Sequence, residues 1–129
     1  MTAEETMLIV DDARLARKMV RSFVATTRPG MTIFEAADGK EAIKILEDMP
    51  SLSFATIDYN MPGMNGLDLA MIIKERLPST RIVLLTANVQ APLRRRAADI
   101  GIDFIDKPVT EVKLSAFFNR AAPRAADQR

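Results

Sequence analysis

The stretch Met7-Leu-Ile-Val-Asp-Asp12 joins a short apolar run directly to two adjacent carboxylates. A near-continuous apolar run of this length is typical of a strand that is covered on both faces, as in a parallel sheet. A second such run, Arg81-Ile-Val-Leu-Leu85, is followed by Thr86. In an open parallel sheet the functional crevice lies beyond the carboxyl ends of the strands. The two runs therefore predict both the sheet and the edge that carries its chemistry.

Three further runs complete a pattern in which strands alternate with stretches of helical period. The predicted strands are 7–10, 32–36, 54–57, 81–85 and, more weakly, 102–105, and the predicted helices are 12–28, 39–49, 66–77, 92–100 and 110–121. Alternation of this kind indicates an α/β fold with a doubly wound five-stranded parallel sheet and helices on both faces. Its crossovers are expected to be right-handed.

Apolar stripes and end signals support the predicted helices. The stripes are Leu15, Met19 and Phe23 in the first helix and Ile43, Leu46 and Met49 in the second. Such spacing predicts the buried face of an amphipathic helix. Asp38 with Glu41 predicts a capping box, Pro92 a first helical turn, Gly101 a helix end and Thr110 an N-cap.

The composition indicates one folded domain. The chain has 129 residues, of which 48% are apolar and 27% charged, and its formal net charge is +1. That length fits a single domain of the usual ~100–200 residues, and the small net charge excludes a global attraction to nucleic acid or anionic lipid. We predict a domain over 1–121 and a short flexible tail over 122–129, because that last segment is polar and interrupted by Pro123.

Two residue types are absent, and their absence excludes several classes of chemistry. The chain has no Cys and no His, so it offers no disulfide, no thiolate or imidazole catalyst and no ordinary zinc site. The N-terminal residues lack the basic and apolar segments of a secretory signal, and no apolar run approaches the ~18 residues of a membrane span. A cytoplasmic location is expected.

The predicted strand ends bring charged side chains to one edge of the sheet. Asp11 and Asp12 follow the first strand, Asp58 the third, Thr86 the fourth and Lys107 the fifth. Each residue alone is more often a helix cap, but clustered carboxylates about 4 Å apart repel by about 4 kcal/mol at an effective dielectric near 20. Lys107 offsets one charge, and Mg²⁺ with oxygen ligands would supply the rest. These residues predict a phosphoryl-accepting site with Asp58 as nucleophile.

Four segments in this order resemble the CheY-like receiver domains of two-component response regulators, of the single-domain, stand-alone type. They are LIVDD at 8–12, DYNMPGMNG at 58–66, LLTAN at 84–88 and DKPVT at 106–110. The resemblance covers nearly the whole chain and implies the strand order 2-1-3-4-5. It also implies that Asp58 is phosphorylated by a sensor histidine kinase or a histidine phosphotransfer protein.

The resemblance also implies roles for individual residues. Asp11, Asp12, Asp58 and the main-chain oxygen of Asn60 are expected to bind Mg²⁺. Lys107 is expected to contact the phosphoryl group and to precede Pro108 through a cis peptide bond. Thr86 and Phe104 are the expected switch pair. The hydroxyl of Thr86 would move toward the phosphoryl group, and the ring of Phe104 would then move inward. Without the resemblance, Phe104 would be interpreted as a core aromatic.

Other positions bear on the switch less directly. Ala87 is small, as access to the acyl phosphate requires, and Asn60 and Asn88 occupy positions that tune dephosphorylation in either direction. Ile102 departs from the small residue usual in the family, which would restrict the loop before the fifth strand. The run Arg94-Arg95-Arg96 has two readings, a solvated helix or a contact with an acidic or nucleotide partner, because successive helical residues rotate by ~100°.

The expected function is a phosphorylation-dependent signalling switch in a two-component phosphorelay, of which chemotaxis is one kind. Phosphorylation would alter binding of an unidentified protein target through the face formed by 92–100, 102–105 and 110–121. We expect no DNA-binding domain, no membrane segment and no enzymatic activity beyond phosphorylation and dephosphorylation of the switch itself. One alternative is an aspartyl-phosphate phosphatase or phosphotransferase of the haloacid dehalogenase type, which requires an Asp where this chain has Asn60. Another is a flavodoxin-like cofactor binder, although Asp11 and Asp12 would repel a flavin phosphate.

Overall fold

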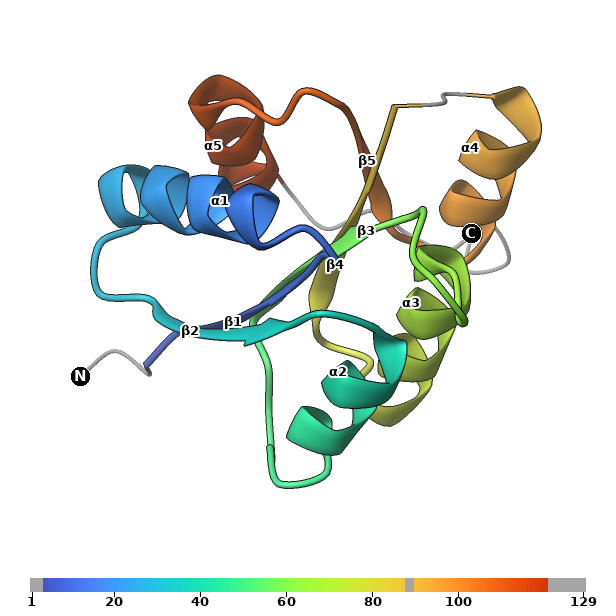
Figure 1. Ribbon diagram of the computed structural model, residues 1–129, viewed down its shortest axis with the longest axis horizontal. Coiled ribbons are helices and arrows are strands. Elements are labelled where there is room, and N and C mark those ends of the chain that lie inside the picture. The colour runs from blue at the N-terminus through green and yellow to red at the C-terminus, as the bar shows by residue number, and fades with distance from the viewer. Residues whose placement is uncertain (1–3, 88–89, 121–129) are drawn as a thin grey trace.

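The computed structural model describes residues 4–87 and 90–120. In these residues a parallel sheet of five strands alternates with five helices (Figure 1). The elements in chain order are β1 Thr6–Val10, α1 Arg14–Thr27, β2 Thr32–Ala36, α2 Gly39–Leu46, β3 Phe54–Asp58, α3 Gly66–Arg76, β4 Arg81–Thr86, α4 Ala91–Asp99, β5 Asp103–Asp106 and α5 Glu111–Asn119. The predicted tail over 122–129 and the predicted position of Asn88 lie outside the described residues.

The sheet has the order β2-β1-β3-β4-β5, which confirms the predicted architecture. Helices α1 and α5 cover one face, whereas α2, α3 and α4 cover the other (Figure 1). Every neighbouring pair of strands is parallel. All five strands therefore end at the same edge of the sheet, which is where Asp58 and Thr86 lie as the last residues of β3 and β4.

Two hydrophobic cores form, one on each face of the sheet. Leu8 and Val10 of β1 belong to the core under α2, α3 and α4, whereas Met7 and Ile9 belong to the core under α1 and α5. Successive side chains of a strand point to opposite faces, so one strand contributes to both cores. This explains why β1 is apolar along almost its whole length, as the near-continuous run predicts.

The predicted helix ends are present in the structure, and for the predicted capping box of Asp38 and Glu41 the described contacts give the N-cap bond of Asp38. The side chain of Asp38 accepts a hydrogen bond from the main-chain N–H of Glu41 at 2.8 Å, and Thr110 accepts one from Lys113 at 3.2 Å. Pro92 lies in the first turn of α4. Gly101 has a φ of +73°, a left-handed conformation that glycine adopts without a steric penalty, and it directs the chain from α4 into β5.

The predicted apolar stripe of α1 is wrong as a buried face. Leu15 and Met19 are 70% and 48% exposed, and the helix instead buries Val20 and Val24, with Phe23 packed at the margin. Both sets have helical spacing, so periodicity alone could not select between them. Contact with α5 and the underlying strands favours the valines, and Leu15 and Met19 are left on the surface.

No helix in the described residues is long and apolar enough to cross a membrane.

Candidate functional site

Three carboxylates meet at the carboxyl edge of the sheet. Asp11 and Asp12 follow β1, and Asp58 ends β3, whose Ile57 pairs with Val10 of β1. Carboxylate oxygens of the three residues lie within 4.8 Å of one another. Asp11 and Asp58 are each 4% exposed, whereas Asp12 is exposed. The cluster therefore has a buried base and one side open to solvent.

Hydrogen bonds hold the turn that carries Asp11. Its main-chain N–H donates to the carbonyl of Ala36, and its carboxylate accepts from the N–H of Ala13 at 2.9 Å. The guanidinium of Arg17 donates to the carbonyl of Asp11 at 2.7 Å and is itself bound to Glu35 at 3.0 Å. The turn is consequently fixed to β2 and to α1, and α1 begins at Arg14, two residues later than predicted.

Lys107 supplies the positive charge of the cluster. Its Nζ lies 2.8 Å from Oδ1 of Asp58 and 3.9 Å from Oδ2 of Asp11. The main-chain N–H of Lys107 donates to the carbonyl of Thr86 at 2.9 Å, which extends the pairing of β4 with β5 by one residue. The peptide bond between Lys107 and Pro108 is cis.

The charges of the cluster do not balance. Burial raises the pKa of Asp11; the hydrogen bond from Ala13 opposes this rise, the charge of Asp58 adds to it, Lys107 lowers the pKa and Asp12 raises it. Within the described residues, three carboxylates face the single ammonium of Lys107. Clustered hard oxygen donors with a negative surplus are the donor set that Mg²⁺ prefers, so these residues fit such an ion.

The loop after Asp58 packs closely against the site. The N–H of Tyr59 donates to the carbonyl of Leu85 at 2.8 Å, and the N–H of Gly66 donates to the carbonyl of Tyr59 at 2.9 Å. A Cβ on Gly66 would lie 2.3 Å from the carbonyl oxygen of Asp58. Glycine is therefore required at this position, because any side chain would displace the residue at the centre of the cluster.

The family model of the response regulator receiver domain matches residues 7–119. The chain belongs to this family. Among its curated relatives, the cyclic di-GMP phosphodiesterase response regulator RpfG of Xanthomonas campestris is 35% identical over 114 residues, which are 85% of this chain and 30% of that protein. The two-component response regulator ORR11 of Oryza sativa is 30% identical over 120 residues, which are 91% of this chain and 80% of ORR11.

The receiver domain spans only part of several relatives. It covers 30% of RpfG, 44% of the transcriptional activator protein ExaE of Pseudomonas putida and 60% of the transcriptional regulatory protein FixJ of Bradyrhizobium diazoefficiens. The activities named for those longer proteins therefore belong to them and are not transferred to this chain.

Solved structures confirm the CheY-like, flavodoxin-like fold of this receiver domain. Chemotaxis protein CheY4 of Vibrio cholerae has a TM-score of 0.81 at 25% identity, with 92% of this chain and 98% of that chain covered. CheY of Borrelia burgdorferi, solved in a complex with CheX, BeF₃ and Mg²⁺, has a TM-score of 0.80 at 27% identity, with 88% and 86% covered.

The two predicted switch residues lie on adjacent strands. Thr86 is 1% exposed at the end of β4 and pairs in register with Asp106, while Phe104 is half-buried on β5. The guanidinium carbon of Arg94 lies 5.7 Å from the centre of the Phe104 ring, and an Arg94 Nη lies 4.0 Å from Asp106. Phe104 is thus covered by a cation of α4 in this structure.

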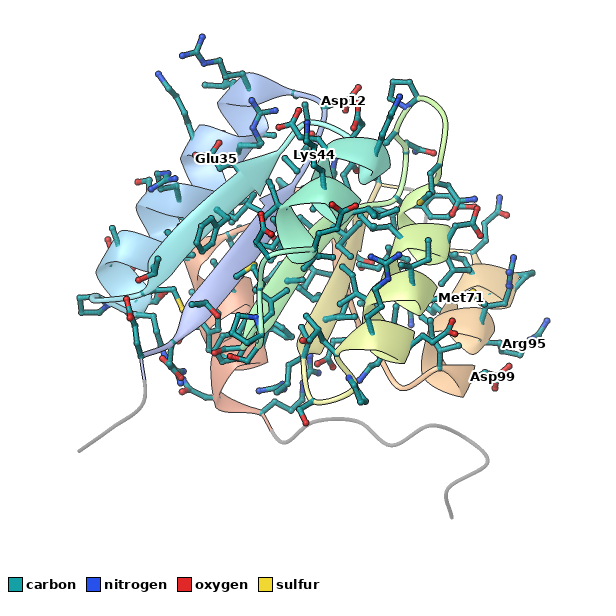
Figure 2. The ribbon with its side chains drawn as sticks, turned by 90° about the horizontal axis from the view of Figure 1, so that it is seen from below. Asp12, Glu35, Lys44, Met71, Arg95 and Asp99 are labelled. Carbon is teal, nitrogen blue, oxygen red and sulfur yellow. The ribbon has the colours of Figure 1, made fainter. Side chains whose placement is uncertain are left out.

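The remaining residues singled out from the sequence differ in their exposure to solvent. Ile102 is buried at 4% in the core under α4, and Ala87 and Asn60 are exposed. Arg95 and Asp99 point away from the protein at the outer face of α4 (Figure 2). Of the three consecutive arginines, Arg94 therefore contacts the Phe104 ring, while Arg95 faces solvent.

The sequence reasoning did not identify three residues that support the site. These are Arg17, which donates to the carbonyl of Asp11, Glu35, which binds the Arg17 guanidinium, and Lys113, whose ammonium binds main-chain oxygens of the loop that carries Lys107. Arg17 and Lys113 act on main-chain groups outside their own helices, and Glu35 acts through Arg17. A charged residue near a predicted helix end gives no signal for such a contact, although Lys113 is unusual as a cation in a first helical turn.

Proposed function

We propose that this receiver domain accepts a phosphoryl group on a carboxylate oxygen of Asp58 from a sensor histidine kinase or a histidine phosphotransfer protein. The observation that carries the proposal is the contact of 2.8 Å between Lys107 Nζ and Asp58 inside a cluster of three carboxylates. An ammonium beside a nucleophilic carboxylate can neutralise the oxygens of an incoming phosphoryl group. Membership of the receiver family supports this kind of partner.

In the proposed step, an oxygen of Asp58 attacks phosphorus while the bond from phosphorus to the donor breaks. From phosphohistidine the phosphorus–nitrogen bond breaks, and the ring, which carries a proton on its other nitrogen, leaves as neutral imidazole. From acetyl phosphate the leaving group is acetate. Lys107 stays protonated and moves with the phosphoryl oxygens that it contacts. The hydroxyl of Thr86 would donate to one of these oxygens.

Asp11, Asp12, Asp58 and the main-chain oxygen of Asn60 would hold Mg²⁺ in this proposal. A bound Mg²⁺ supplies charge neutralisation for the phosphoryl group. Burial raises the pKa of Asp11 despite the hydrogen bond from Ala13 and the charge of Lys107, and this supports a site that a cation would stabilise. The Mg²⁺ and BeF₃ named for the Borrelia burgdorferi complex are consistent with the same chemistry in a related chain.

The test is intact-mass measurement after incubation with acetyl phosphate and Mg²⁺. We expect one phosphoryl group to be added, and none in Asp58→Asn or in excess chelator. The matched control Asp68→Asn changes an exposed Asp on α3 and should be modified like the wild type. Persistent modification of Asp58→Asn would contradict the assignment of Asp58.

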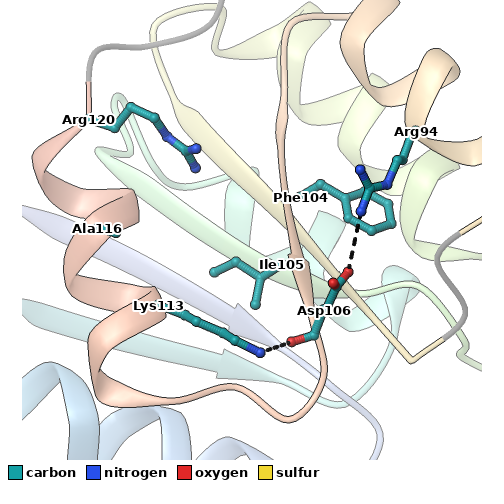
Figure 3. Close-up of a pocket in the computed structure, with 7 residues that line it drawn as sticks. All are labelled: Arg94, Phe104, Ile105, Asp106, Lys113, Ala116 and Arg120. Carbon is teal, nitrogen blue, oxygen red and sulfur yellow. Dashed lines mark hydrogen bonds and ion pairs between the residues drawn. The ribbon is translucent and has the colours of Figure 1, made fainter.

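We further propose that phosphorylation acts through Thr86 and Phe104 on a surface formed by α4, β5 and α5. A pocket on this surface is lined by Phe104 together with three cations, Arg94, Lys113 and Arg120 (Figure 3). Inward movement of Phe104 would change the pocket and remove the ring contact of Arg94. The cations favour an acidic partner surface, and such binding should weaken as salt rises.

The switch is tested by adding BeF₃⁻ and Mg²⁺ to isotopically labelled protein and following amide resonances. We expect shifts at Phe104 and Arg94 as well as near Asp58, and the distant Phe34 should be unaffected. Changes confined to the residues around Asp58 would contradict a switch through β5. A full population shift needs ~5.5 kcal/mol of differential stabilisation, so a partial shift is expected without a partner.

We propose that the chain works as such a switch, with no reaction other than its own phosphorylation and dephosphorylation. The cytoplasmic location expected from the sequence is compatible with the absence of a membrane-spanning helix in the described residues.

A further inference from the structure

We propose that Lys113 is a positioning residue for phosphoryl transfer, because it fixes the main chain on both sides of Lys107. The inference rests on the proposed function, since the importance of Lys107 depends on that function. Lys113 does not contact Asp58 or the other carboxylates; its effect would pass through the loop between β5 and α5.

The contacts of the Lys113 ammonium define this role. Its Nζ donates to the carbonyl of Asp106 at 2.9 Å (Figure 3). It also donates to the carbonyl of Pro108 at 3.1 Å, and Asp106 and Pro108 are the residues immediately before and after Lys107. One flexible side chain of α5 thus bridges two carbonyls of the loop. The Lys107 side chain leaves the main chain between these two anchors and reaches Asp58 at 2.8 Å.

The peptide unit between Asp106 and Lys107 is held at both ends. Its N–H donates to the carbonyl of Thr86 on β4, and its carbonyl accepts from Lys113 on the opposite side. β5 is the edge strand of the sheet, so the outward carbonyl has no further strand to pair with. Lys113 takes the place of that missing strand and prevents rotation of the peptide plane that precedes Lys107.

The position of Lys113 in α5 supports a role outside its own helix. Thr110 caps the helix and binds the N–H of Lys113, which places a cation in the first turn of α5. A positive charge is unfavourable at that end of a helix because the main-chain N–H groups there carry partial positive charge. In α2 the corresponding position, three residues after the capping Asp38, holds Glu41. The contact with the two carbonyls explains why a lysine is present in α5.

The experiment compares Lys113→Met with the wild type in three measurements: phosphorylation by acetyl phosphate, Mg²⁺ affinity and unfolding. We expect the phosphorylation rate to fall about tenfold, because misplacing a reacting group by 1 Å can cost up to about 100-fold. Mg²⁺ affinity should stay within about twofold, because the three carboxylates are not held by Lys113. Stability should change little, because the loss of two hydrogen bonds opposes the gain from removing a positive charge at the helix N-terminus.

Matched variants separate this role from a general effect of charge or folding. Lys113→Arg retains donors for both carbonyls and should stay within about twofold of the wild-type rate. Lys113→Gln keeps N–H donors but has no charge and a shorter side chain, and its rate should lie between those of the Arg and Met variants. Lys44→Met makes the same change on an exposed part of α2 and should have the wild-type rate.

Three outcomes would overturn the inference: equal rates for Lys113→Met and wild type, equal rates for Lys113→Arg and Lys113→Met, or a parallel loss of Mg²⁺ affinity and stability in Lys113→Met. Failure of the proposed function is distinguishable from all three, because the wild-type protein would then not be phosphorylated at all. An amide spectrum adds a direct readout, in which Lys113→Met should shift the resonance of Lys107 more than that of Thr86.

Discussion

The two ends of the sheet differ in how their charged side chains are paired. At the amino end, Phe54 stacks edge-on with Phe117 and Phe118 at centroid distances of 5.8 and 4.9 Å. Arg28 and Arg81 lie over these rings. Each arginine also has a carboxylate partner, Glu5 for Arg28 and Asp103 for Arg81. These two arginines are therefore paired with carboxylates and packed against aromatic surface.

The carboxyl end has a charge surplus instead. Asp11, Asp12 and Asp58 face Lys107, and the buried Asp11 has a raised pKa. Removing a carboxylate should therefore destabilise the protein at the amino end and stabilise it at the carboxyl end. The comparison indicates that the amino end contributes more to folding stability than the carboxyl end, where three carboxylates face one ammonium.

The largest effect is expected from Phe117→Ala at the amino end. The ring is fully buried between Phe54 and Phe118, so its removal should lower the free energy of unfolding by about 3–5 kcal/mol. Urea denaturation measures this loss. Val112→Ala on the same helix is the control, because Val112 is 78% exposed and its truncation should change stability by about 0.5 kcal/mol or less.

The same substitution at the two ends gives the sharpest test of the comparison. Asp103 is 8% exposed and lies 2.9 Å from Arg120 and 3.4 Å from Arg81, so Asp103→Asn should destabilise the protein by about 1–3 kcal/mol. Asp11→Asn keeps an oxygen for the N–H of Ala13 and should stabilise the metal-free protein by about 1 kcal/mol. Both are measured by urea denaturation in chelator, and equal signs would contradict the comparison.

The sequence could predict most of the carboxyl end, because its residues are fixed by local rules. Asp58 and Thr86 end buried strands, and parallel strands end at a common edge. The amino end was not predicted, because Arg28, Arg81 and Asp103 meet through contacts between distant segments that leave no periodic signal. The buried face of α1 was missed for a related reason, since two stripes fitted and tertiary packing selected the valines.

A pH series distinguishes the contributions of two carboxylates. The pKa of Asp11 is raised above its ordinary value of 3.8, which means that the folded protein favours the protonated carboxyl. The contribution of Asp11 to the free energy of unfolding is therefore fully present below that pH and is lost as pH rises through the folded-state pKa. Partial burial acts to raise the pKa of Glu35, but hydrogen bonds from Arg21 and Arg17 lower it below 4.5, so its contribution is present above that value and is lost as pH falls.

The measurement is the difference in unfolding free energy between Asp11→Asn and wild type in chelator, from pH 4 upward. We expect this difference to grow with pH and then level off, and excess Mg²⁺ should remove or reverse it. A difference that is constant with pH would contradict the raised pKa of Asp11. Glu35→Gln should show the opposite trend against the wild type, with its deficit shrinking as the solution is made acidic.

The smallest expected effect is a change in the emission of Tyr59. The chain has one Tyr and no Trp, and Tyr59 directly follows Asp58 with its half-buried ring against the core under α2 and α3. Addition of Mg²⁺ should produce a small saturable change that disappears in Asp12→Ala. If calorimetry shows Mg²⁺ binding while emission stays flat, the ring does not sense the carboxyl end.

The sharing of β1, β3 and β4 between two cores has a consequence for amide hydrogen exchange. Leu8 and Ile9 are neighbours in sequence but pack into different cores, so neither helical layer can detach without exposing side chains of a strand that also serves the other. The slowest amides should therefore lie on these three central strands and exchange by a common opening of the whole domain. The edge strands β2 and β5 should exchange faster, through smaller openings that leave the central strands protected.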